Sequence, residues 1–191
     1  NFMVSLWFKC AVGGSESTQN LLGIGDYNHN DGFLIQAVNS SGKYIDVGYL
    51  GVSGNSFAST AGVQAGFIDQ AWNHLFVHLR NNTFNMWVNG KKNTVSGGTW
   101  TGSSINWTTK WTQRQIVIGG RAGNVGGATN AWSSATTEIA LVRIAGGGSA
   151  ANTDQPSNEE IRKIYEDEKS MFEPNAKVTI SGSTSYARAM D

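Results

Sequence analysis

The side chains best suited to ligand chemistry lie in a tryptophan-rich segment, residues 96–111. It holds three tryptophans within a run of Gly, Ser, Thr and Asn. An exposed tryptophan is costly unless it packs or binds a ligand. Sugar rings offer C–H faces that lie on indole rings, while Asn, Ser and Thr match their hydroxyl groups. The segment therefore predicts a glycan-binding platform; the alternative is that its tryptophans hold a long loop against the domain. The predicted ligand-binding residues are Trp100, Asn106, Trp107 and Trp111, with Trp132 from a similar polar stretch.

A second candidate is the polar stretch 26–31, which places oxygen-bearing side chains at alternate positions, as calcium loops do. Its sixth position is Asp31, where the EF-hand loop requires glycine, so that pattern fails. Asn and Asp also form turns by bonding their local backbone. The stretch therefore predicts either a hairpin turn or a calcium site. The calcium ligands would be Asp26, Asn28, Asn30 and Asp31.

The acidic residues give little support to hydrolysis. A glycosidase needs two carboxyl groups about 5–9.5 Å apart, one of them a proton donor. Residues 71–121 contain no Asp or Glu, and Asp26, Asp31, Asp46 and Asp69 are scattered. We therefore predict a protein that is not an enzyme, with a polysaccharide hydrolase as an alternative.

Other reactive residues also favour structural roles. Cys10 is the only cysteine and has no histidine near it in sequence, so we expect a small buried hydrophobe rather than a nucleophile. His74 and His78 fall on one face of a predicted strand. Four residues of strand span roughly 13 Å, too far for one metal ion to bind both. We expect both histidines to pack inside the protein.

Composition limits the remaining classes. The chain has 191 residues, enough for one ordinary domain, with 14 basic and 14 acidic side chains. A net charge of zero argues against binding nucleic acid or an acidic membrane through bulk charge. No apolar stretch approaches the ~18–20 residues that span a bilayer. Residues 70–137 carry six cations and no acid, which favours a polar, uncharged ligand.

Short runs of alternating apolar and polar residues, bounded by turn residues, predict short strands separated by turns. The strongest signal is a hairpin over residues 72–88, closed by the turn dipeptide Asn89-Gly90. We expect Trp7, Trp72 and Trp87 to lie in strands and belong to the core. The other predicted strands are residues 2–9, 21–25, 32–38, 43–47, 115–118 and 137–144.

One helix is predicted over residues 157–172. Ser157 and Glu160 form a capping box, and Ile161, Ile164 and Tyr165 give an apolar stripe at helical spacing. The only two prolines of the chain bracket the segment, where neither breaks an interior hydrogen bond. We expect this amphipathic helix to cover an edge or face of a β-sandwich, with its charged side in solvent.

The ordered series of motifs resembles laminin-G-like, concanavalin A-like domains. The matching stretches are LWF at 6–8, LGIGD at 22–26, WNHLFV at 72–77, WVNG at 87–90, IGG at 118–120, IALVRI at 139–144 and SNEEI at 157–161. The resemblance covers residues 2–172. It implies an all-β fold, a two-sheet antiparallel jelly-roll sandwich with one C-terminal amphipathic helix. Ala140-Leu141 stands where the family has an Asp-Glu pair, so no role of that pair is carried over.

The resemblance also implies a set of possible functions for the chain. Relatives of this fold often bind calcium, and they include lectins as well as glucanases with an E-x-D-x-E strand that is absent here. Residues 164–172 further resemble segments in tail and fibre proteins of marine bacteriophages. We expect a lectin-like module that needs no cofactor beyond the candidate calcium. A purely structural adhesion domain is the alternative.

Both ends of the chain resemble cuts from a longer protein. We predict one jelly-roll domain over residues 1–174, and residues 175–191 as a strand and tail that start a following segment. The parent protein is expected to be extracellular or at a virion surface, such as a phage tail, and it could be oligomeric. The expected partner is a glycan or polysaccharide, with no nucleic acid and no membrane insertion.

Overall fold

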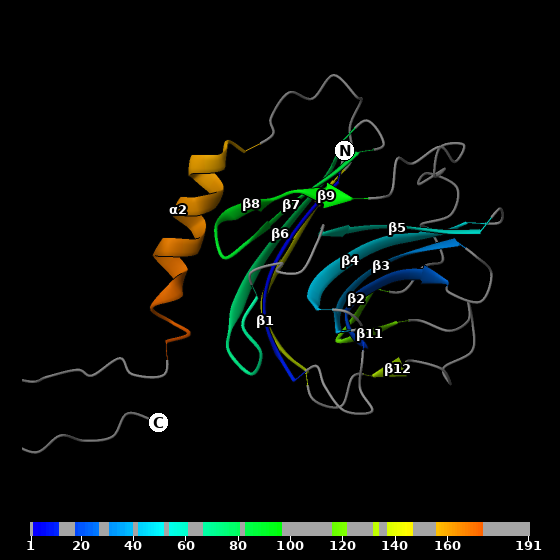
Figure 1. Ribbon diagram of the computed structural model, residues 1–191, viewed down its shortest axis with the longest axis horizontal. Coiled ribbons are helices and arrows are strands. Elements are labelled where there is room, and N and C mark those ends of the chain that lie inside the picture. Colours follow the sequence, from blue (N-terminus) through cyan, green and yellow to red (C-terminus); the bar gives the residue numbers. More distant parts are fainter. Residues whose placement is uncertain are drawn as a thin grey trace, which may run out of the picture.

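The computed structural model places most strands in two antiparallel sheets that pack face to face (Figure 1). This two-layer arrangement is the predicted sandwich. The residues that the structure describes are 2–11, 18–26, 31–39, 42–51, 54–60, 67–80, 83–96, 116–121, 132–133, 137–146 and 156–173. Residues 175–191 lie outside them, so the prediction of a following segment stays a prediction.

The first sheet has five strands in the order β13-β1-β6-β7-β8. They are β1 (Phe2–Cys10), β6 (Asn73–Arg80), β7 (Thr83–Val88), β8 (Lys91–Asn93) and β13 (Thr137–Gly146). The β7–β8 hairpin turns at Asn89 and Gly90, whose φ angles are 51° and 72°. Two successive positive φ angles are what a type I′ turn requires, so the predicted turn is confirmed. The hairpin predicted over residues 72–88 is confirmed by the antiparallel pairing of β6 with β7.

The second sheet has six strands in the order β10-β2-β3-β4-β5-β9. They are β2 (Thr18–Asp26), β3 (Asp31–Asn39), β4 (Lys43–Gly51), β5 (Gly54–Thr60), β9 (Val95–Ser96) and β10 (Ile116–Ile118). A short ribbon pairs β11 (Gly120–Arg121) with β12 (Trp132–Ser133). The sequence did not predict β5, whose Ser- and Gly-rich composition has weak strand propensity. Pairing with β4 supplies what local propensity lacks.

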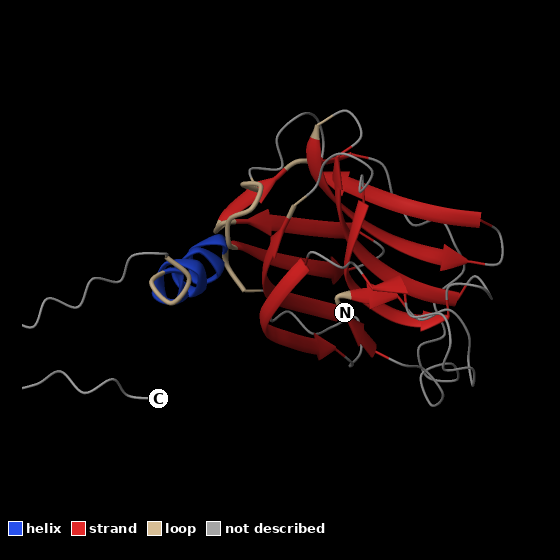
Figure 2. Ribbon diagram, turned by 90° about the horizontal axis from the view of Figure 1, so that it is seen from below, coloured by secondary structure: helices blue, strands red, loops and turns tan. Residues whose placement is uncertain are grey.

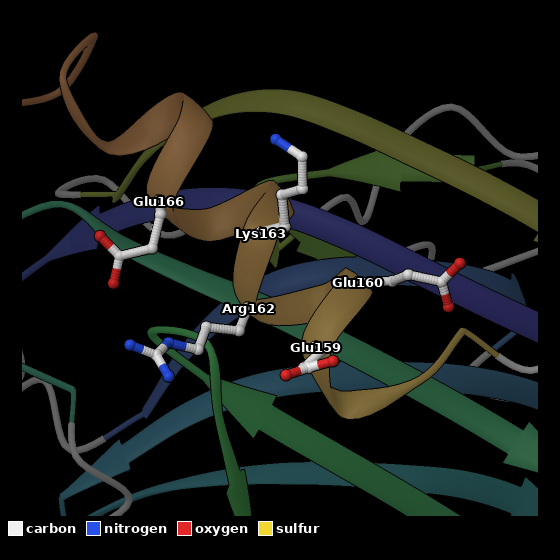
Figure 3. Close-up of a pocket in the computed structure, with 5 residues that line it drawn as sticks. All are labelled: Glu159, Glu160, Arg162, Lys163 and Glu166. Carbon is white, nitrogen blue, oxygen red and sulfur yellow. The ribbon is translucent and has the colours of Figure 1, made fainter.

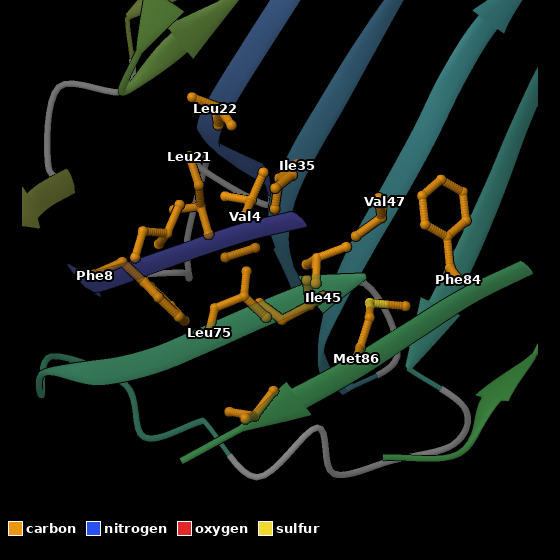
Figure 4. Close-up of a cluster of buried hydrophobic side chains, with 14 of the residues drawn as sticks. Val4, Phe8, Leu21, Leu22, Ile35, Ile45, Val47, Leu75, Phe84 and Met86 are labelled. Atoms are coloured by element: carbon orange, nitrogen blue, oxygen red, sulfur yellow. The ribbon is translucent and has the colours of Figure 1, made fainter. Parts of the chain in front are cut away.

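Alternate residues of both sheets fill one core between them. In β1, Val4, Leu6 and Phe8 point inward and are 0% exposed, as is Leu75 in the neighbouring β6. Figure 4 shows Val4, Phe8 and Leu75 among residues of the six-stranded sheet, including Leu22, Ile35, Ile45 and Val47. Burying one such side chain contributes about 1.5–3 kcal/mol, so this cluster is the main source of stability.

A bulge in β13 keeps its apolar residues in the core. Ser5 pairs with Arg143, whereas Trp7 pairs with Ala140, so β13 has one residue more than β1 over this stretch. Leu141 takes up the difference with a φ of 47°, and it is 38% exposed. A left-handed leucine costs roughly 1–2 kcal/mol. Without this bulge, strict alternation would place Val142 and Ile139 on opposite faces; both pack against the core.

Helix α2 (Asn158–Lys169) confirms the predicted amphipathic helix. The Ser157 side chain accepts a hydrogen bond from the Glu160 backbone N–H, while the Glu160 carboxylate accepts one from the Ser157 N–H. The two bonds form the predicted capping box. Figure 2 shows the helix outside the sandwich, and Figure 1 shows it beside the five-stranded sheet.

The tryptophans of this sheet lie under α2 rather than between the sheets. Trp87 is 0% exposed and packs with Phe76 and Ile161, and Trp7, 1% exposed, stacks on Phe172 at 4.3 Å between ring centroids. Trp7 and Trp87 are therefore buried in strands as predicted, but in a second cluster. The prediction for Trp72 needs correction, because it precedes β6 and is only half-buried.

We predict that Gly90→Ala destabilises the protein more than Gly119→Ala. Both glycines have positive φ, 72° and 73°, so each alanine costs roughly 1–2 kcal/mol of backbone strain. At Gly90 an added Cβ would also meet Tyr165 Cδ1 at 3.0 Å, whereas the nearest atom at Gly119 is Ile139 Cδ1 at 3.7 Å. The overpacking should cost a further ~1–3 kcal/mol in urea denaturation. Equal losses in both variants would show that α2 does not press on the hairpin.

Candidate functional site

The outer face of the six-stranded sheet carries a row of polar residues that the strand register aligns. Asn20 pairs with Gln36, and Gln36 pairs with Asp46. We call these three residues the polar row. At the level of the backbone the register continues from Asp46 to Ser59 and then to Ser96. Adjacent strands are about 4.8 Å apart, so the five aligned positions span about 19 Å.

The polar row faces away from the core because its sequence neighbours face into it. Ile35 and Ala37 flank Gln36, and Ile45 and Val47 flank Asp46; all four belong to the core cluster. The three row residues are half-buried. Gln36 Nε2 donates to Asn20 Oδ1 at 2.8 Å, which fixes the orientation of both amides. The row thus presents amide and carboxylate groups, which can donate to and accept from a polyhydroxylated ligand.

Asp26 and Asp31 close the β2–β3 hairpin. They are cross-strand partners in the register, so their Cα atoms are about 4.5–5.5 Å apart. The β4–β5 hairpin closes at the same end of the sheet, because Gly32 pairs with Leu50. We call this the hairpin end. It lies about 17 Å from the polar row, five residues along β3.

The strands that flank residues 97–115, the stretch with Trp100, Trp107 and Trp111, end near the polar row and near the hairpin end. The segment begins after Ser96, the last position of the aligned register, and ends before Ile116. Ile116 pairs with Ile24, two residues before the hairpin end. The strand register therefore brings the two termini of the tryptophan segment to the two polar regions of one sheet.

Of the predicted ligand-binding residues, only Trp132 lies among the described ones, in a ribbon near the Asn20 end of β2. Trp132 pairs with Arg121 in the ribbon that follows Gly119, whose N–H bonds the Leu21 carbonyl. Because β10 runs antiparallel to β2, this ribbon lies toward the end of β2 opposite to Asp26. The binding role of Trp132 stays a prediction. So do the roles of Trp100, Asn106, Trp107, Trp111, Asn28 and Asn30, which lie outside the described residues.

Asp46 and Asp69, the other two acids considered for hydrolysis, do not lie beside Asp26 and Asp31. Asp69 forms an ion pair with Lys43 at 3.1 Å. Asp46 belongs to the polar row, well away from the hairpin end. Among the described residues no group of three or more His, Cys, Asp or Glu side chains could hold a metal ion.

The histidine pair and the cysteine are packing residues. His74 and His78 are 0% and 2% exposed, on the face of β6 that α2 covers in part. Burial lowers the pKa of His74 to about 4, so its imidazole is neutral at pH 7. Cys10 is 1% exposed and belongs to the core cluster. Burial, with the nearby Asp69 carboxylate, raises the pKa of its thiol to about 12.

A depression of about 400 Å³ lies along the outward side of α2. Five charged residues line it, three acidic and two basic, and Figure 3 shows their side chains projecting outward from α2. Lys163 already pairs with Asp167 at 2.6 Å, and Glu160 belongs to the capping box. This is the solvated charged face that the sequence predicted, not a built binding site. The lining residues are Glu159, Glu160, Arg162, Lys163 and Glu166.

The polar row was not predicted from the sequence. Its members sit singly between apolar residues in three strands, as in the stretch LIQAV around Gln36. Strand alternation could have marked each as facing outward. Only the register between strands, including a bulge between Asn20 and Leu22, brings them into line.

No helix within the described residues is long and apolar enough to cross a bilayer.

Comparisons with known proteins support the fold. No family model matches the chain, and no curated protein sequence matches it. Among solved structures, it is similar to the CBM40 module of Ruminococcus gnavus IT-sialidase bound to α2,3-sialyllactose, with a TM-score of 0.58, 15% identity, and coverage of 86% of this chain and 82% of that one.

Two further structures agree. A heptameric SAP-like pentraxin from Limulus polyphemus has a TM-score of 0.54 at 13% identity, over 86% of this chain and 69% of that one. Domain 4 of AbnA, an extracellular arabinanase from Geobacillus stearothermophilus in complex with arabinotriose, has a TM-score of 0.51 at 15% identity, over 86% and 66%. The chain therefore has the predicted laminin-G-like, concanavalin A-like jelly-roll fold. The phage-tail resemblance gains no support.

We predict that Cys10 does not react in the native protein. At pH 8 a thiol with a pKa near 12 holds very little thiolate, and the side chain is 1% exposed. Iodoacetamide should leave the folded chain unmodified for hours and modify it at once in 8 M urea, as intact mass measures. Rapid labelling without urea would contradict the buried, protonated state.

Proposed function

We propose that this protein is a non-catalytic carbohydrate-binding module whose ligand contacts the outer face of the six-stranded sheet. The observation that carries the proposal is the polar row, a set of amide and carboxylate side chains aligned across neighbouring strands. Sugar hydroxyls both donate and accept hydrogen bonds, and such a row can satisfy several of them at once. A structure of similar fold in complex with arabinotriose, an uncharged glycan, supports the same ligand class by analogy.

The tryptophan segment completes the proposed site. Its termini adjoin the polar row at Ser96 and the hairpin end at Ile116. In the proposal Trp107 and Trp111 stack on sugar rings, while Gln36 and Asp46 bond the hydroxyls. The Asp46 carboxylate makes an anionic sugar a poor ligand, in agreement with the preference for an uncharged one.

We predict that Gln36→Ala and Trp107→Ala each weaken glycan binding about tenfold. A lost hydrogen bond or ring contact of this kind is worth about 1 kcal/mol or more. A glycan array with the multimerised chain identifies the ligand, and calorimetry measures Kd for each variant. Lys163→Ala, on the outward side of α2, is the matched control and should bind normally.

The double variant Gln36→Ala/Trp107→Ala tests whether the polar row and the tryptophan segment contact the same ligand. Residues that contact one ligand show coupled losses, whereas separate sites add independently. Loss of binding in Trp107→Ala and Trp111→Ala with unchanged binding in Gln36→Ala would move the site away from the polar row. No binding to any glycan would reject the module and favour the structural alternative.

The hairpin end is our proposed calcium site. Like charges directly opposite each other destabilise a hairpin, and Asp26 and Asp31 are directly opposed. A divalent cation between them would turn this repulsion into attraction. The backbone pairing thus fits two carboxylate ligands, and Asn28 and Asn30 would supply the other side-chain oxygens.

We predict that 10 mM Ca²⁺ stabilises the chain by about 1–3 kcal/mol over EDTA, as for a site with Kd near 0.1–1 mM. Asp31→Asn should abolish the calcium-dependent rise in Tm. In EDTA the same variant should be at least as stable as the unaltered chain, because one of the two opposed charges is gone. A variant that is equally destabilised with and without calcium would reject a metal role for Asp31.

The expected weakness of a single glycan site suggests what kind of larger protein would contain this module. A single shallow glycan site binds weakly, with millimolar Kd worth about −4 kcal/mol, so several copies are needed for firm attachment. We propose that it serves within a larger, multimeric extracellular or virion-surface protein, for which a phage tail adhesin is one form. The hydrolase alternative predicts new reducing ends on incubation with polysaccharides; their absence for a bound glycan supports the non-catalytic proposal.

A further inference from the structure

Helix α2 covers the five-stranded sheet without contributing to the sandwich core. Within the described residues, the cluster between the sheets contains no residue of α2. The helix is held instead by side-chain contacts on the outer face. Ile161 packs between Phe76 and Trp87, and the Trp87 indole donates to Asn158 Oδ1 at 2.9 Å. Opening of the helix would therefore remove no residue from the sandwich core.

His74 lies beneath this helix with one ring nitrogen unsatisfied. Its Nε2 is hydrogen-bonded to Ser5 Oγ at 2.9 Å, while its Nδ1 has no hydrogen-bond partner in the described part of the chain. The ring is tilted against Trp7 at 5.3 Å and stacked with Tyr165 at 6.2 Å between centroids. An imidazolium has two N–H donors, so protonation would leave a charged donor buried without an acceptor.

The charges around His74 offer it no free counter-ion. Glu168 of α2 accepts from the Trp7 indole at 2.7 Å and from the Arg143 guanidinium of β13 at 2.6 Å. Glu168 is thus engaged by Arg143. Burial lowers the pKa of His74 most strongly, the Glu168 charge raises it, and the Arg143 charge lowers it. On α2, Lys169 is a further cation, 5.9 Å from the Tyr165 ring centroid.

We propose that His74 makes α2 an acid-releasable cover, in which protonation of the imidazole weakens the docking of the helix on the sheet. Burial lowers the pKa of docked His74 from 6.5 to about 4. The docked state therefore disfavours the proton. Its stability is complete above pH 6.5 and is lost as the pH falls toward 4. Release would uncover Trp7, Trp87 and Phe76, an aromatic surface closed at neutral pH.

Hydrogen exchange of the full chain between pH 7 and pH 4.5 tests the proposal. After division by intrinsic exchange rates, protection of residues 158–169 should fall by about 60-fold, as the two pKa values require. Protection of β3 and β4 should stay unchanged. His74→Gln should remove the pH dependence, and Glu168→Gln, which keeps the histidine, should retain it.

Three outcomes would overturn the proposal. They are an acid loss that persists in His74→Gln, one that disappears in Glu168→Gln alone, or simultaneous loss of protection in α2 and both sheets. If His74→Gln does not fold, NMR of the unaltered chain follows the His74 C–H signals. Titration that accompanies the opening of α2 supports the cover, and titration with α2 still docked overturns it.

Discussion

Strand alternation in the five-stranded sheet is the constraint on which the rest of the structure depends, because both faces of this sheet are buried. In β1, Val4, Leu6 and Phe8 fill the sandwich while Ser5 and Trp7 lie under α2. A shift of one residue in register would exchange the two sets and bury polar groups between the sheets. The bulge at Leu141 follows from this constraint. A strained backbone conformation at Leu141 keeps the apolar residues of β13 on the face that packs against the core.

The two sheets consequently have different outer faces. The five-stranded sheet presents aromatic rings and a neutral histidine, and α2 closes this face with hydrogen bonds to both buried indoles. The six-stranded sheet presents the polar row instead. The proposed ligand face and the docked helix thus lie on opposite sides of the molecule, with the sandwich core between them.

Much of this fold follows from local sequence signals. The Asn89-Gly90 turn, the Ser157 capping box and the alternating strands were predictable because each depends on residues close in the chain. Strand β5 and the bulge were not, since pairing with neighbouring strands overrides weak propensity there. The candidate site shows the same division: the opposed Asp26 and Asp31 belong to one predicted hairpin, whereas the polar row joins strands that are separate in sequence.

By itself, then, the sequence determined the jelly-roll class, the helix and the burial of Trp7, Trp87, His74 and Cys10, because hydrophobic periodicity and turn chemistry act over a few residues. Only the tertiary structure decided which of two apolar clusters each tryptophan joins, and which polar residues stand side by side. Those outcomes depend on the register between strands, and register is set by the fit of whole faces, which no short stretch of sequence contains.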